Sequence, residues 1–297
     1  MHPVLFRIGS FPIALYGVMI AVGMIIAVFL VLRLARRLGV KDDVVIDIVF
    51  YSVIAGMIGA RILYIIVNFK DFVNHPLFYI FNRQGFVLWG GVLGASPVVY
   101  YMIKKKGLVL NKSLDLAAVG LILAQAFGRI GCFFSGCCFG KVTKSFLGIQ
   151  FPRFFYPNIN VGKMSEAEIA NLITRDKISF EGSPPFQYHY DAGWVHLTDT
   201  HSLPVYPTQL FEAFADFIIF GILLYVYLRK KKFDGQVFAL YLLLYSVARF
   251  IIEFFRGDIE RGVYFNFLST SQIICVFIFF IGLWIFKKFK RNSLVRN

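Results

Sequence analysis

Seven mostly apolar runs dominate the sequence, each at least about 18 residues long, which is the length a helix needs to cross a bilayer. The runs are residues 12–32, 44–69, 85–103, 113–135, 207–228, 236–255 and 269–286. Charged residues make up 16% of the chain, against about 25% in an ordinary soluble domain. We therefore expect an all-α integral membrane protein with seven transmembrane helices. Because no linker divides the runs, residues 1–297 should form a single membrane domain.

Connections rich in Lys and Arg alternate with connections poor in them. The rich ones are residues 33–42, 104–112, 229–232 and the tail after residue 286, with four, four, four and five bases. The poor ones are residues 1–11, 70–84 and 256–268, with one, two and two bases. The positive-inside rule then predicts an N-terminus outside and a C-terminus in the cytoplasm. Because the bases are dispersed and belong to no motif, the net charge of +14 does not indicate nucleic-acid binding.

The connection 141–206 is long and lies between the fourth and fifth runs, so it should be outside and form a small extracytoplasmic head. Within it, SEAEIANLIT at 165–174 is typical of a short helix. Ser165 is the expected N-cap, and Glu168 completes a capping box.

Three arginines lie inside the predicted spans: Arg61, Arg129 and Arg249. They belong to the second, fourth and sixth runs, all of which are predicted to lead from the cytoplasm to the exterior. Each lies roughly 20–27 Å along its helix, in the outer part of a hydrocarbon core about 30 Å thick. An arginine at the centre of a span costs about 2.5–3.5 kcal/mol. Such residues need either partners or a function.

Internal pairing is one explanation of these arginines. Glu253 follows Arg249 by four residues and can meet it on one helix face, while Glu212 and Asp216 can serve the other two arginines. Neighbouring glycines then serve close helix packing: Gly59, Gly128 and Gly131. The favoured interpretation is a phosphate pocket, because guanidinium offers planar bidentate donors and the outer leaflet supplies anionic phospholipid.

The stretch GRIGCFFSGCCFG at 128–140 resembles the signature of the prolipoprotein diacylglyceryl transferase family. Other segments agree with the family in the same order: IALYG at 13–17, GARILY at 59–64, WGG at 89–91, YPTQLFEA at 206–213 and YSVARFIIEFFR at 245–256. The resemblance covers nearly the whole chain. It implies a bacterial enzyme of the plasma (inner) membrane, multi-pass, with an active site that opens to the outer leaflet.

The resemblance also implies the reaction. The diacylglyceryl group of phosphatidylglycerol passes to the lipobox cysteine thiol of a prolipoprotein, which forms a thioether and releases glycerol phosphate. The partners it implies are phosphatidylglycerol, prolipoprotein signal peptides with a lipobox cysteine and the lipid bilayer, with no nucleic acid. Neither a cofactor nor a metal is expected.

Site residues follow from the match to the family motifs. Arg129 matches the arginine that binds the phosphatidylglycerol headgroup, and the implied catalytic set is Arg129, Arg249, Glu253 and Tyr16. The implied substrate-binding set is Arg129, Arg61, Cys132, Gly140, Trp89, Gly90 and Gly91. Three positions depart from the best-studied members: Cys132 replaces an asparagine, Cys137 a glutamate, and Trp89 a histidine proposed as a base.

The base that takes the thiol proton stays open, because arginine cannot act as one in this pH range. The candidates are Glu253, Tyr16, water and the head histidines, which on their own are expected to be solvated loop residues: His189, His196 and His201.

The cysteines offer a second open question. Cys132, Cys137 and Cys138 do not match a zinc-site spacing, and a disulfide between the two adjacent ones would be strained. We expect them to be small residues that allow close packing, and Cys275 to lie in the core.

Two other function classes remain. A non-enzymatic protein that binds or flips anionic phospholipid would use the same arginine pocket. However, a transporter should carry polar or broken helices at the midplane, and the inner halves of these runs are nearly uncharged. A seven-span receptor of the retinal type requires a lysine in its last span, and residues 269–286 contain none.

Overall fold

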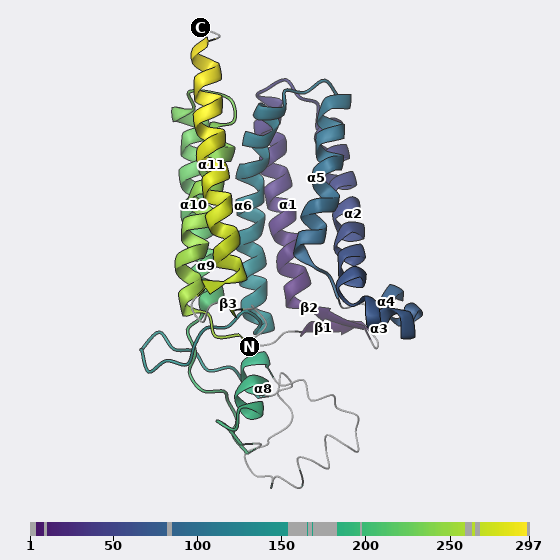
Figure 1. Cartoon of the computed structure of the whole chain (residues 1–297), viewed down its shortest axis with the longest axis vertical. Helices are drawn as coiled ribbons and strands as arrows, with labels where there is room; N and C mark the ends of the chain where they lie inside the picture. Colours follow the sequence, from purple (N-terminus) through teal and green to yellow (C-terminus); the bar gives the residue numbers. More distant parts are fainter. Residues whose placement is uncertain are drawn as a thin grey trace. The chain divides into compact units, whose positions relative to one another are not determined.

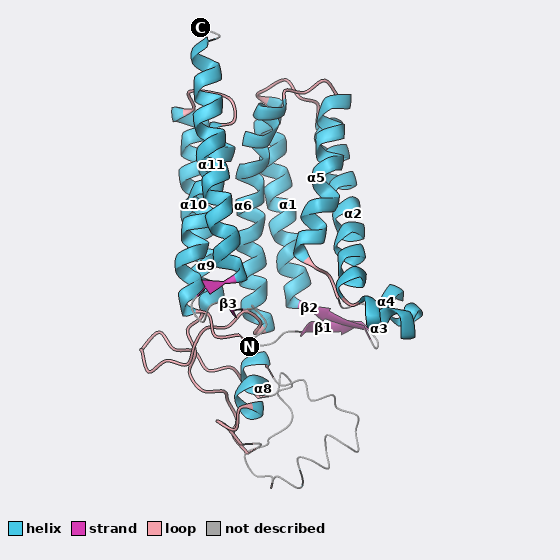
Figure 2. Cartoon of the chain, viewed as in Figure 1, coloured by secondary structure: helices cyan, strands magenta, loops and turns pink. Residues whose placement is uncertain are grey.

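The computed structural model describes residues 4–8, 11–81, 85–153, 165, 168, 183–196, 198–258, 263–264 and 268–295. Within these ranges the chain is mostly helical (Figures 1 and 2), and six helices are long and apolar enough to cross a membrane. They are α1 (Leu15–Arg36), α2 (Asp42–Val67), α6 (Leu110–Ser135), α9 (Thr208–Tyr225), α10 (Gln236–Ile252) and α11 (Thr270–Val295). A π-helical turn, Val226–Lys230, extends α9, and a 3-10 turn, Glu253–Phe255, extends α10. Six of the predicted runs are thereby confirmed as long apolar helices.

The remaining predicted run, 85–103, corresponds to the helix α5 (Leu88–Lys105). It has 18 residues, but its glycines, Pro97 and the two lysines of its last turn reduce its mean hydropathy, so α5 is not among the six. A seventh span at this position therefore stays a prediction.

Several short elements in the connections were not predicted. They are the antiparallel hairpin of β1 (Val4–Ile8) and β2 (Phe11–Ala14), the helices α3 (Phe69–Asn74), α4 (Pro76–Phe81) and α8 (Pro184–Asp191), and the paired strands β3 (Val263–Tyr264) and β4 (Leu268–Ser269). Each is at most eight residues long, so none carries the extended hydrophobic period that identifies an element from sequence.

The chain forms two compact units, residues 28–120 and residues 1–27 with 121–297. In the unit 28–120, α2 and α5 pack through glycines. A Cβ at Gly59 would meet the Gly90 carbonyl oxygen and the Gly94 backbone, and a Cβ at Gly94 would meet the Ala55 carbonyl oxygen. Small residues let two membrane helices approach this closely. The predicted packing role of Gly59 is confirmed.

In the other unit, α9 and α10 bury stripes with helical spacing. On α9 the buried residues are polar near the N-terminus and apolar further along: Gln209, Glu212, Ala213, Asp216, Ile219 and Leu223. On α10 the order is reversed, from Val237 and Ala239 to Ser246 and Arg249. Because α10 packs against α9, the polar parts of the two stripes meet at one end of these helices. That end holds the candidate site.

The head has a small core of its own within residues 136–153 and 183–206. Ile149 and Val205 exchange two backbone hydrogen bonds of 3.0 Å, and Val205 packs with Phe139 and Phe151. The predicted capping box is confirmed, because the Ser165 N–H donates to the Glu168 carboxylate over 2.8 Å and the Ser165 hydroxyl accepts from the Glu168 N–H. The rest of the predicted helix 165–174 lies outside the described residues.

Candidate active site

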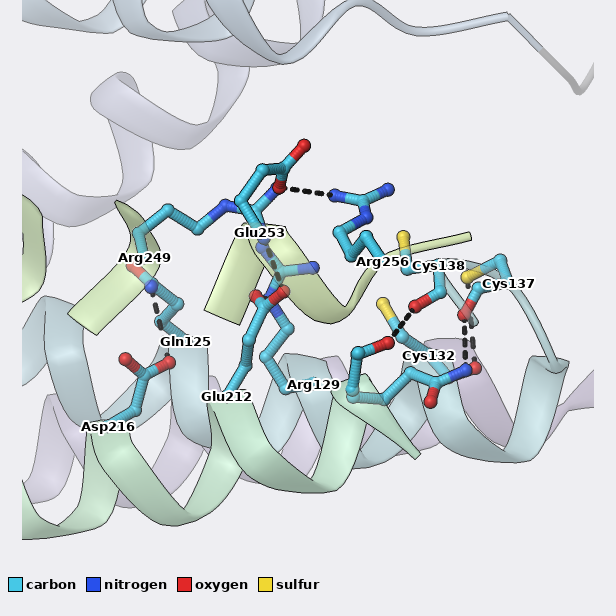
Figure 3. Close-up of polar contacts among 12 residues, drawn as sticks. Gln125, Arg129, Cys132, Cys137, Cys138, Glu212, Asp216, Arg249, Glu253 and Arg256 are labelled. Carbon is cyan, nitrogen blue, oxygen red and sulfur yellow. Dashed lines mark hydrogen bonds and ion pairs between the residues drawn. The ribbon is translucent and has the colours of Figure 1, made fainter. Parts of the chain in front are cut away.

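Three helix ends supply charged side chains to one place in the unit formed by 1–27 and 121–297 (Figure 3). Arg129 comes from the C-terminal part of α6, Glu212 from the first turns of α9, and Arg249 from the last turn of α10. Glu253 follows in the 3-10 turn, and Arg256 in the loop after it. These residues form one network.

Glu212 is the centre of the network, because its two carboxylate oxygens hold two different arginines. Oε2 lies 2.6 Å from Nε of Arg129, and Oε1 lies 2.5 Å from Nη1 of Arg249. The Glu212 side chain is buried, with 4% of its surface exposed. The prediction that Glu212 can pair with an arginine is confirmed.

Arg249 connects Glu212 to the next members of the network, Glu253 and Arg256. Its Nη2 lies 2.8 Å from the Glu253 carboxylate, which confirms the pair predicted from their spacing of four residues. The same carboxylate oxygen lies 3.7 Å from Nη1 of Arg256, which also pairs with Asp258. Burial disfavours the cation of Arg256, but its hydrogen bonds to the Asp258 carboxylate and nearby negative charges outweigh this effect and raise the pKa of Arg256. Within the described chain, three guanidinium groups therefore alternate with three carboxylates.

Arg129 differs from the other two arginines in the donors it has left. Its ion pair uses Nε, and within the described part of the chain its two terminal nitrogens make no further ion pair or hydrogen bond. Arg249, by contrast, engages both terminal nitrogens. Arg129 is also the most exposed of the three, at 18% against 8% for Arg249 and 10% for Arg256. It is the arginine with donors available to an external anion.

A second polar group lies beside this network. The Gln125 amide donates to the Asp216 carboxylate over 3.2 Å and accepts from the Tyr241 hydroxyl over 3.5 Å. Internal pairing of the arginines would have used Asp216 as a partner, but its carboxylate accepts this hydrogen bond from α6. The contact fixes α6 against α9 one turn below Arg129.

The segment after α6 turns sharply and brings its cysteines together. Gly136 and Cys138 have positive φ values of 75° and 58°. Two α9 side chains hold the turn, since Thr208 Oγ1 donates to the Cys138 carbonyl and Gln209 Nε2 to the Cys137 carbonyl, both over 2.6 Å. The sulfur atoms of Cys132, Cys137 and Cys138 all lie within 4.8 Å of one another. The three thiols form a cluster, which the sequence spacing did not predict.

Hydrogen bonds and nearby cations lower the pKa of one thiol in this cluster, that of Cys138. Hydrogen bonds from Cys132 and Cys137 hold the pKa of Cys138 below its usual range, and the cations of Arg256 and Arg129 act in the same direction against the effect of burial. All three cysteines are half-buried and free. Cys275, in α11, is buried as predicted.

Gly140 lies where backbone segments pass close to one another. Its N–H donates to the Tyr206 carbonyl over 2.9 Å, and it forms an antiparallel bridge with Arg256. A Cβ at this position would meet the backbone of Tyr206 and the Phe255 carbonyl oxygen. A glycine is required there, because it lets the loop after α10, with Arg256, lie against the cysteine turn.

Tyr16 lies at the start of α1, against α6. A Cβ at Gly131 would come within 3.1 Å of the Tyr16 carbonyl oxygen, so the predicted close packing at Gly131 is confirmed. A Cβ at Gly128 would meet nothing within 4 Å, so that prediction is wrong. Tyr16 as a whole residue is 43% exposed. Its catalytic role stays a prediction.

Four other predicted residues belong to the unit 28–120. Arg61 donates from Nη1 to the Gly85 carbonyl over 3.0 Å, and its guanidinium lies over the rings of Tyr64 and Phe86. On α5, Gly90 and Gly91 face α2, and Trp89 is 44% exposed. Packing explains the two glycines. Substrate binding by these four residues stays a prediction.

The head histidines differ from one another. His196 and His201 are exposed, as expected. His189 is fully buried instead, because its Nδ1 accepts the Leu203 N–H over 3.2 Å and its ring packs at 5.5 Å from that of Trp194. Burial lowers the pKa of His189. It is therefore a core residue of the head, which corrects the expectation of a solvated side chain.

Arg256 was not among the predicted site residues. It follows a predicted span and belongs to a base-poor connection, so it was counted as a loop base. Its spacing of three residues from Glu253, within one helical turn, was the available signal.

Comparison with known proteins identifies what the chain is similar to. The family model for prolipoprotein diacylglyceryl transferase matches residues 3–287. A phosphatidylglycerol–prolipoprotein diacylglyceryl transferase of Clostridium tetani is 34% identical over 96% of this chain and 97% of its own length. A second such transferase, from Clostridium perfringens, is 34% identical over 96% of this chain and 94% of its own length. One from Finegoldia magna is 27% identical over 99% of this chain and 98% of its own length.

Proposed function

Because this chain belongs to the prolipoprotein diacylglyceryl transferase family, we propose that its arginine network holds the phosphate of phosphatidylglycerol while the diacylglyceryl group leaves. The protein is a multi-pass membrane transferase of lipoprotein biosynthesis. Its donor is phosphatidylglycerol and its acceptor a prolipoprotein, as in the relatives named for that reaction.

The proposal depends on the hydrogen-bond donors that Arg129 has left. Glu212 holds its Nε, while the terminal nitrogens remain for an acceptor outside the network. Two parallel N–H donors match two phosphate oxygens, which is the geometry that makes arginine selective for phosphate. Because the ion pair to Glu212 uses Nε, Arg129 can bind the anion through its terminal nitrogens without breaking that pair.

The chemistry places the charge where Arg129 can stabilise it. The acceptor thiol, as thiolate, attacks C3 of the glycerol, and a sulfur–carbon bond forms as the carbon–oxygen bond to the phosphate breaks. The electron pair leaves with glycerol phosphate, so negative charge grows on the phosphate oxygens. Preorganised donors aimed at such developing charge are worth about 100–1,000-fold in rate.

Arg249 and Glu253 act as positioning residues in this scheme. Both terminal nitrogens of Arg249 are engaged by carboxylates, so its role is to orient Glu212 and through it Arg129. Tyr16 and Cys132, near Arg129, remain candidates for contact with the acceptor. Arg61, Trp89, Gly90, Gly91 and Gly140 complete the proposed substrate-binding set.

The membrane arrangement forms part of the proposal. We place the N-terminus and the head 141–206 outside, the C-terminus in the cytoplasm, and α5 as the seventh span. The uneven distribution of Lys and Arg supports this orientation. The arginine network then lies in the outer leaflet of the plasma membrane, where phosphatidylglycerol headgroups and the lipobox cysteine of a signal peptide meet.

The test is a transfer assay with purified protein. Labelled phosphatidylglycerol vesicles and a lipobox peptide should give one thioether-linked diacylglyceryl group for each glycerol phosphate released. A peptide with serine in place of cysteine, and vesicles of phosphatidylcholine, are the controls. Lipid binding or flipping without any product would refute the transferase assignment.

A further inference from the structure

The three-thiol cluster is more than the close packing that its sequence suggested. Cysteines 132, 137 and 138 follow a C-x4-C-C pattern, which no common zinc motif has. In the folded chain, however, their sulfur atoms lie within 4.8 Å of one another. Three sulfurs at the corners of a tetrahedron around zinc are about 3.8 Å apart, given a Zn–S bond of about 2.3 Å. Each observed separation is at most about 1 Å longer than that.

The backbone holds this arrangement at an energetic cost. Cys138 has a φ of 58°, and the left-handed conformation costs about 1–2 kcal/mol for a residue with a Cβ. Hydrogen bonds of 2.6 Å from Thr208 and Gln209 to the carbonyls of Cys138 and Cys137 maintain the turn. Strain of this kind concentrates at functional sites. Here it brings the sulfurs of two consecutive residues toward Cys132.

The surrounding charge suits a thiolate site that carries net negative charge. Three thiolates and one divalent cation sum to −1. Arg129 and Arg256 both act electrostatically on the Cys138 sulfur and offset that charge. The carboxylates of Glu212 and Glu253, in the neighbouring network, are engaged by arginines. Sulfur is thus the ligand this place offers, and zinc is the divalent metal that prefers three or four thiolates.

We propose that Cys132, Cys137 and Cys138 bind a zinc ion whose fourth position takes the thiol of the lipobox cysteine. This inference rests on the proposed function. Catalytic zinc sites keep three protein ligands and one open position, and a thiol that coordinates zinc loses its proton. The proton passes to water and the thiolate then attacks C3 of the phospholipid. The site thereby supplies the activated nucleophile for which sequence alone identified no base.

Metal binding provides a readout that does not depend on activity. Protein purified anaerobically in detergent should bind one Zn²⁺, and Co²⁺ in its place should show the sulfur-to-metal charge-transfer absorption of a tetrahedral thiolate site. Cys132→Ala and Cys137→Ala should each weaken binding by more than the about 10–100-fold that loss of an outer-shell partner costs. Cys275→Ala, which removes a buried cysteine outside the cluster, should bind Zn²⁺ normally. A preparation that binds no Zn²⁺, or in which two of the three thiols form a disulfide under these conditions, would overturn the proposal.

The substrate provides the second readout. A cysteine lipobox peptide should change the Co²⁺ spectrum, while the serine peptide should leave it unchanged. Removal of zinc with a chelator should lower the transfer rate at least tenfold, and restored Zn²⁺ should recover it. A full transfer rate in zinc-free protein would overturn the zinc inference and leave the transferase assignment intact. No transfer in either metal state, with a normal spectral response to the cysteine peptide, would instead overturn the transferase assignment and keep the metal site.

Discussion

Replacement of Arg129 by alanine separates the two roles a buried arginine can have, support of the fold and binding of the substrate. Glu212 loses one ion pair in this variant, but it keeps the other, to Arg249 at 2.5 Å. The expected loss of stability is therefore that of one charged hydrogen bond, about 1.5–3 kcal/mol. The transition state loses both terminal donors of Arg129. We expect the transfer rate to fall at least about 100-fold, or about 2.7 kcal/mol.

Glu212→Gln is the matched opposite case. It leaves the guanidinium groups of Arg129 and Arg249 buried without their shared anion, and a broken buried ion pair costs about 3–5 kcal/mol. Transfer assays give the rates, and thermal unfolding in detergent gives the stabilities, with Arg36→Lys as a surface control outside the site. The reasoning fails if Arg129→Ala keeps more than a tenth of the activity. It also fails if Arg129→Ala unfolds at as low a temperature as Glu212→Gln.

Three further predictions follow from particular contacts. Arg129→Lys should retain membrane insertion but stay well below one tenth of the wild-type transfer rate, because a point charge replaces the planar fork; near-normal transfer would contradict bidentate phosphate binding. Gly94→Leu should weaken the packing of α2 on α5, seen as a lower unfolding temperature, while Gly221→Leu, where a Cβ meets nothing within 4 Å, should have little effect. Burial in the folded protein lowers the pKa of His189 below its ordinary value of about 6.5. The free energy of unfolding should therefore fall as the pH drops below about 6.5. Trp194 fluorescence against pH, in wild type and in His189→Phe, measures this, and identical profiles would exclude His189 as the cause.

The helices could be predicted because apolar length alone identifies them. The predicted run 44–69 became Asp42–Val67, and 236–255 became a helix and a 3-10 turn that end at Phe255. The pair of Arg249 and Glu253 followed from helical spacing, which is a local rule. The meeting of Arg129 and Arg249 also agrees with their similar predicted depth, whereas the third arginine of the network, Arg256, was not predicted.

The rest depended on backbone conformations and packing that no spacing encodes. The left-handed conformation of Cys138 determines whether the side chains of the adjacent cysteines diverge or point to the same cluster. This conformation is held by hydrogen bonds from Thr208 and Gln209, about 70 residues away. The role of Glu212 as a shared partner for two arginines likewise required α6, α9 and α10 to meet. The buried His189 required the head fold. Long-range contacts therefore account for these three outcomes.

The order of charges in the network explains why it needs carboxylates at all. Three guanidinium groups placed together at low dielectric would repel one another and would not hold a fixed position. Here Arg256 and Arg249 each lie between two carboxylates, and the sequence of ion pairs begins at a carboxylate and ends at a cation: Asp258, Arg256, Glu253, Arg249, Glu212 and Arg129. A phosphate on the terminal nitrogens of Arg129 would be the next anion in this alternation. The phosphate would therefore extend a pattern whose own charges already balance. Binding requires no carboxylate to leave, which makes Arg129, the last cation in the series, the one suited to stabilise a charge that appears only during the reaction.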